Sequence, residues 1–96
     1  MKHILYIEKV THNTPSAYYA ISDSRTNKQW ILQYNSSLQD VTNYCFGYID
    51  AMNKLGMNYD YLVRYSENIS DELDHDLKLL VISENDFQSY RGVNKI

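Results

Sequence analysis

The chain has 96 residues, enough for one small domain with a single hydrophobic core but too few for a separate substrate-binding domain. Its composition, with 44% hydrophobic residues, one Pro and three Gly, is that of a folded chain and excludes an intrinsically disordered one. The net charge of −3 argues against a general binder of nucleic-acid phosphates, which requires clustered Lys and Arg. We therefore expect one domain, residues 1–96, that does not bind nucleic acid directly.

The sequence predicts neither a membrane span nor a signal peptide, and its single cysteine allows no intramolecular disulfide. No apolar run approaches the roughly 18 residues of a membrane span, and Glu8 interrupts the first apolar segment before a signal-peptide core could form. Cys45 is the only cysteine, so the intramolecular disulfides common in small secreted domains cannot form. These features predict a cytoplasmic protein with no membrane partner.

Three β-strands are predicted in the first third of the chain. Residues 2–10 are rich in β-branched and aromatic side chains and are followed by a polar loop at 11–15. Residues 17–22 have the composition of a second strand. The polar hexamer 23–28 then separates it from residues 29–34, which predicts a hairpin between strands two and three.

An amphipathic helix follows. Ser36 and Gln39 have the spacing of a capping box, and Gly56 stands where a glycine commonly ends a helix. Apolar residues recur at helical spacing within about 100° of arc on a helical wheel. They are Leu38, Val41, Cys45, Tyr48, Ile49 and Met52. We expect this stripe to pack on the sheet, leaving Phe46, which points away from it, exposed for a partner.

The second half of the chain gives weaker patterns. Residues 59–66 alternate with period two, which predicts a strand. One face of that strand would carry Tyr59, Tyr61, Val63 and Tyr65. Residues 77–82 are interpreted as a further strand, although the apolar residues between 69 and 81 also fit a helical stripe. Ser83 is a good N-cap for a short final helix.

Together these elements have the order β-β-β-α-β-β-α. The prediction is an α+β fold, with an antiparallel sheet and one main amphipathic helix packed on one face.

The acidic residues are concentrated in the second half. Residues 1–58 hold five Lys/Arg and four Asp/Glu, whereas residues 59–96 hold four and eight, so the formal charges are +1 and −4. Tyrosine is enriched at protein interfaces because it supplies a large contact area at little cost in side-chain entropy. The predicted partner-binding residues are Tyr59, Tyr61, Tyr65, Glu67, Asp71, Glu72, Asp74, Asp76 and Phe46.

Residues 71–76 hold four carboxylates and His75, which are donors that a divalent cation can use. The segment lacks the spacing and the turn glycine of a calcium loop, and no second His or Cys lies near enough for zinc. We interpret it as a solvated or partner-facing acidic loop and assign neither metal nor cofactor.

Two catalytic interpretations are possible, of which the metal-dependent hydrolase is kept as an alternative. Asp60, followed by Asp76 and Lys78, resembles the PD-(D/E)xK nuclease arrangement, in which two acids and a lysine converge on a metal; the resemblance implies a metal-dependent hydrolase. Cys45 would need an adjacent base to act as a nucleophile, and its place in the centre of the apolar stripe favours a buried core residue. We assign no catalytic residue.

The favoured function is a non-enzymatic inhibitor whose acidic, Tyr-rich face covers the basic, nucleic-acid-binding surface of another protein. In its small size, its acidity and a residue usage of the kind that AT-rich codons yield, the chain resembles the anti-defence proteins of phages and plasmids, anti-CRISPR proteins among them. That likeness is one of type and implies no residue roles.

A small-molecule binder is the main alternative, with a nucleotide-like ligand held by tyrosines and Trp30 in an oligomer seam. Arg25, Lys28 and Arg64 would then matter more than the acids. A homodimer formed through Phe46 and an unpaired sheet edge is a further expectation.

Overall fold

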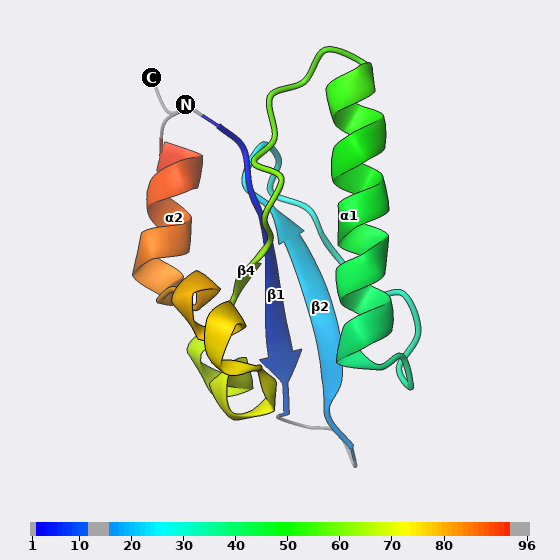
Figure 1. The fold of residues 1–96 in the computed structure, drawn as a ribbon, viewed down its shortest axis with the longest axis vertical. Helices are drawn as coiled ribbons and strands as arrows, with labels where there is room; N and C mark the ends of the chain where they lie inside the picture. The colour runs from blue at the N-terminus through cyan, green and yellow to red at the C-terminus, as the bar shows by residue number, and fades with distance from the viewer. Residues whose placement is uncertain (1, 12–15, 93–96) are drawn as a thin grey trace.

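The computed structural model describes residues 2–11 and 16–92 and is built around a four-stranded sheet with the order β3-β2-β1-β4 (Figure 1). The strands are β1 (Leu5–Val10), β2 (Tyr18–Asp23), β3 (Gln29–Trp30) and β4 (Arg64–Tyr65). β2 pairs antiparallel with both β1 and β3, as the predicted hairpin requires, whereas β4 pairs parallel with β1. The α+β class is confirmed, and the sheet is mixed rather than purely antiparallel.

In the described part of the chain, two α-helices and two 3-10 helices accompany the sheet. They are α1 (Leu38–Lys54), α2 (Glu84–Gly92), η1 (Glu67–Glu72) and η2 (His75–Leu80). Figure 1 shows α1 and α2 on opposite sides of the sheet, with η1 and η2 below α2, beside the end of β1. None of the helices within residues 2–11 and 16–92 combines the length and the apolar composition of a membrane span.

β1 is buried on both faces. Leu5 and Ile7 pack in the core on the α1 side of the sheet, whereas Ile4 and Tyr6 pack with Phe87 of α2 on the other side. The rings of Tyr6 and Phe87 stack with their centroids 4.4 Å apart. A central strand covered on both faces explains the continuous apolar run at the start of the sequence.

Both ends of α1 are capped by side chains or backbone groups close in sequence. Ser37, rather than the predicted Ser36, is the N-cap, because its Oγ accepts a hydrogen bond of 3.1 Å from the Asp40 N–H. Gly56 adopts a φ of 92°, and the N–H of Met57 donates to the carbonyl of Met52 at 3.1 Å. These are features of a Schellman motif and confirm the predicted helix end at Gly56.

The sequence-based prediction of a strand at residues 77–82 is wrong. Residues 75–80 form η2, and only Val81 makes an isolated bridge, to Tyr65. The Asp74 carbonyl accepts from the N–H groups of both Leu77 and Lys78, so this backbone is satisfied by local turns. Leu79 is 87% exposed, and the apolar residues here therefore do not all serve the core.

Two other predicted strands are shorter than expected, since β3 and β4 each contain two residues. Before β4, the Asp60 carboxylate accepts from the Leu62 N–H at 3.0 Å, a local bond that competes with strand pairing. Most of the loop predicted at 11–15 lies outside the described residues. The short final helix is confirmed, with Ser83 Oγ accepting from the Asp86 N–H at 3.0 Å.

Two glycines, Gly47 inside α1 and Gly56 just after its end, provide a matched test of where the helix ends. We expect Gly47→Ala to raise the free energy of unfolding by about 1 kcal/mol, because alanine favours the helix interior and the added Cβ meets no atom within 4 Å. Gly56→Ala should lower it by about 1 kcal/mol or more, because φ is positive there. Urea denaturation measures both; equal effects of the two changes would contradict the assigned helix end.

Candidate functional site

The structure separates the three tyrosines predicted to share one surface. Tyr59 and Tyr65 are each only 1% exposed, whereas Tyr61 is 65% exposed. The predicted tyrosine face is therefore wrong, because Tyr59 and Tyr65 belong to the core and cannot present their rings to a partner in this conformation. The alternation of residues 59–66 is broken by the loop before β4.

Phe46 and part of the acidic segment, by contrast, come together at a groove between α1 and the two 3-10 helices. The groove has a volume of about 310 Å³. Its lining consists of Leu38, Gln39, Thr42, Phe46, Tyr65, Glu72, Leu73, Asp74 and Leu77. Two of the predicted carboxylates, Glu72 and Asp74, thus lie next to the predicted exposed aromatic residue.

The interior of the groove is mostly apolar. Two buried hydroxyls of its lining, Thr42 Oγ1 and the Tyr65 hydroxyl, lie 3.3 Å apart and form a hydrogen bond in which either can donate. Phe46 is 43% exposed and Leu77 is 36% exposed. These side chains leave apolar surface open to solvent beside charged groups, an arrangement typical of interaction sites.

Carboxylates dominate the two 3-10 helices that form one wall. Residues 67–80 contain five Asp/Glu and one Lys, and all five acids are exposed. Of these acids, only Glu72 pairs with a described cation, at 2.8 Å from Lys9 Nζ. Partial burial would raise the pKa of Glu72, but hydrogen bonds from Lys9 and Tyr19 outweigh it and lower the pKa.

The acidic residues within 67–80 lie on a segment that is packed against the core. Ile69 of η1 is fully buried, and Leu73, which follows η1, is 8% exposed. These apolar side chains anchor the segment that carries the carboxylates. Asn68 Nδ2 donates to the Lys9 carbonyl at 2.8 Å, tying η1 to the end of β1. The charges of this wall are therefore held at defined positions.

A buried carboxylate, Asp23, was missed in the sequence, where it looked like a turn residue. It is 1% exposed, and its Oδ2 accepts from the hydroxyls of Tyr59 at 2.5 Å and Tyr48 at 3.1 Å. Its Oδ1 accepts from the Arg25 N–H at 2.9 Å. Burial, followed by the bond to Asp23, raises the pKa of Tyr59, which keeps the hydroxyl protonated as a donor. The alternation of the strand could have indicated this burial. Asp23 lies two residues after Ile21 and four after Tyr19, and both of those side chains face the core.

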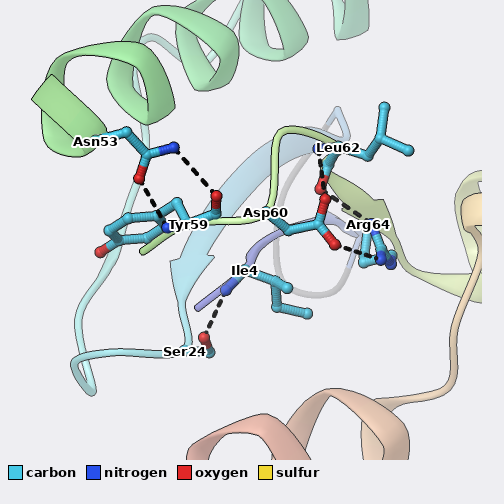
Figure 2. A network of polar contacts seen from close by, with 7 residues as sticks. All are labelled: Ile4, Ser24, Asn53, Tyr59, Asp60, Leu62 and Arg64. Atoms are coloured by element: carbon cyan, nitrogen blue, oxygen red, sulfur yellow. Dashed lines mark hydrogen bonds and ion pairs between the residues drawn. The ribbon is translucent and has the colours of Figure 1, made fainter. Parts of the chain in front are cut away.

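A second polar network holds the loop between α1 and β4 (Figure 2). The Asn53 amide accepts from the Tyr59 N–H at 2.8 Å and donates to the Tyr59 carbonyl at 3.1 Å. The Asp60 carboxylate lies 3.0 Å from Arg64, and Ile4 donates to Ser24 Oγ at 2.7 Å. Asn53 thus joins this loop to the end of α1, and the Asp60 carboxylate is paired with Arg64.

The structure places the residues of the nuclease-like arrangement on other elements than the resemblance implies. Asp76 and Lys78 lie on η2 instead of a strand, while Asp60 pairs with Arg64 before β4. No group of three or more His, Cys, Asp or Glu that could hold a metal ion occurs in the described part of the chain. Cys45 is fully buried, and burial raises the pKa of its thiol to about 12, which disfavours the reactive thiolate.

The Asp23 network predicts a large loss of stability on substitution. Asp23→Asn replaces one accepting oxygen with an NH₂ group, which faces a hydrogen-bond donor and cannot accept from it. The substitution should lower the free energy of unfolding by about 2–4 kcal/mol. Asp50→Asn is the matched control, since Asp50 is exposed and its one ion pair with a described residue is with Lys54, at 3.1 Å. It should cost about 0.5 kcal/mol or less. Similar losses in urea denaturation would show that the Asp23 bonds contribute little.

The groove therefore combines an apolar interior, one exposed aromatic ring and fixed carboxylates, which suits it to hold a basic and apolar segment of another molecule. Comparison of the chain with known protein families, curated proteins and solved structures finds no match.

Proposed function

We propose that this protein is a non-enzymatic inhibitor that docks its acidic groove onto a basic surface of another protein. The observation that carries the proposal is that Phe46, 43% exposed, lines one groove with the carboxylates Glu72 and Asp74, of which Asp74 pairs with no described cation. We call the surface formed by the groove and by η1 and η2 the acidic groove.

Charge defines the chemistry of the partner. Four of the five carboxylates of residues 67–80 pair with no described cation, so their field is available to an incoming Lys or Arg. Such a field speeds encounter with basic surfaces and repels acidic ones. Proteins that bind nucleic acid display the required basic surface, because they must neutralise phosphates.

Phe46 and Leu77 supply the apolar part of the contact. A partner side chain inserted between them would lose its hydration, which adds affinity that charge alone does not provide. The volume of about 310 Å³ lies at the low end of small-molecule sites, roughly 300–1,000 Å³. It fits one or two side chains of a docked protein better than an enclosed ligand.

Inhibition follows from the geometry of the proposed contact. Carboxylates held on a fixed frame can occupy the positions that phosphates take in the cleft of a nucleic-acid-handling enzyme. A partner covered in this way could no longer bind its nucleic acid. An anti-defence role against such an enzyme, in a phage or mobile element, is the biological setting that we propose.

The test compares three immobilised forms of the protein. Wild type, the groove variant Phe46→Ala/Asp74→Lys and the control Tyr61→Ala/Glu84→Lys are exposed to a nuclease-treated lysate of a low-GC bacterium at low salt. Each variant loses one exposed aromatic residue and reverses one exposed acid. We expect basic proteins to be retained by wild type and control and reduced at least about tenfold on the groove variant.

Two further results decide the proposal. A captured protein, once purified, should lose nucleic-acid binding when wild type is added, and the groove variant should restore it. Equal retention on all three surfaces, or unchanged nucleic-acid binding, would contradict the proposal. If sedimentation instead shows a dimer of wild type that the groove variant abolishes, a second copy occupies the groove and the inhibitor proposal fails.

A further inference from the structure

A second concave surface lies on the opposite flank of α1, between the helix, β3 and the turn before β3. Its lining consists of Asn27, Lys28, Gln29, Trp30, Tyr44 and Tyr48, and its volume is about 630 Å³. None of these residues lines the acidic groove. We propose that this aromatic hollow binds a planar ring that carries an anionic group, such as a nucleoside monophosphate.

The aromatic residues of the hollow are arranged without stacking on one another. The ring centroids of Trp30 and Tyr48 are 5.5 Å apart with an interplanar angle of 45°, and those of Trp30 and Tyr44 are 6.4 Å apart at 69°. Tyr44 is also 44% exposed. Because these rings are tilted, they leave aromatic surface on which a planar ligand can stack.

The polar lining selects an anion. Lys28 is the one charged residue among the described residues that line the hollow, and it forms no ion pair with a described acid. An aromatic cage for a quaternary ammonium group would gain nothing from a lysine in its wall. An ammonium group beside stacked rings instead matches a ligand with a ring at one end and a phosphate or carboxylate at the other.

Asp23 positions both walls of the hollow before any ligand arrives. Its carboxylate accepts from the Tyr48 hydroxyl on α1 and from the Arg25 N–H in the turn. Within the same turn, the Thr26 N–H donates to the Asp23 carbonyl and the Lys28 N–H donates to Thr26 Oγ1, both at 3.2 Å. Ligand binding would thus require little new ordering of these walls, which favours affinity.

Trp30 provides a direct probe, because it is the only tryptophan of the chain. Its indole Nε1 is buried and has no hydrogen-bond partner among the described residues. We expect AMP to change the Trp30 fluorescence and the indole N–H signal in a saturable way at low salt. Adenosine and ribose 5-phosphate, which each lack one half of the required chemistry, should bind at least about fivefold more weakly.

Substitutions locate the effect. Lys28→Gln should weaken AMP binding but not adenosine binding, and Tyr44→Ala should weaken both about fivefold or more. Lys78→Gln on η2 removes the same charge outside the hollow and should leave AMP binding unchanged. The groove variant should also bind AMP normally, so the two proposals fail independently.

Three outcomes would overturn the inference. They are the absence of a saturable response to AMP, equal AMP affinity in wild type and Lys28→Gln, and tighter binding of choline than of AMP. The last result would identify the hollow as a cation site.

Discussion

The buried carboxylate of Asp23 is the interaction on which the arrangement of this small domain depends. A charge withdrawn from water is costly unless its oxygen atoms are met by donors, and here three donors come from three parts of the chain. They are the turn after β2, the middle of α1 and the loop that leads to β4. Asp23 thereby joins α1, the turn between β2 and β3 and the loop between α1 and β4 at one end of the sheet.

The elements that were predicted correctly from the sequence are those specified by short-range patterns of residues. The 3.6-residue period and the glycine with positive φ define α1, and the buried face of the helix contains Val41, Cys45 and Ile49 as expected. The β2–β3 hairpin followed from its polar turn. The parallel pairing of β4 with β1 depends on a crossover through α1, which no local pattern of residues 59–66 reveals.

The candidate site was predictable in its exposed parts and not in its buried ones. Phe46 stood out on the helical wheel, and the acids stood out by their number, so two walls of the groove were identified separately. Alternation alone does not say whether a strand face meets solvent or core, and for this reason Tyr59 and Tyr65 were misplaced. The contact between the two walls is tertiary and became visible only in the fold.

The helix α1 organises the two proposed surfaces. Phe46 and Tyr44 are two residues apart, which places them about 160° apart around the helix axis. One flank therefore meets the 3-10 helices at the acidic groove, and the other meets β3 at the aromatic hollow. The two surfaces differ in charge, so each suits ligands that the other would repel.

Cross-saturation NMR tests most directly whether the acidic groove is the docking surface. Isotope-labelled protein would be measured in complex with an unlabelled partner captured as above, so that signal loss marks the residues in contact. The proposed account predicts the strongest losses at Phe46, Asp74 and Leu77. Losses confined to α2 or to the loop that carries Tyr61 would contradict it.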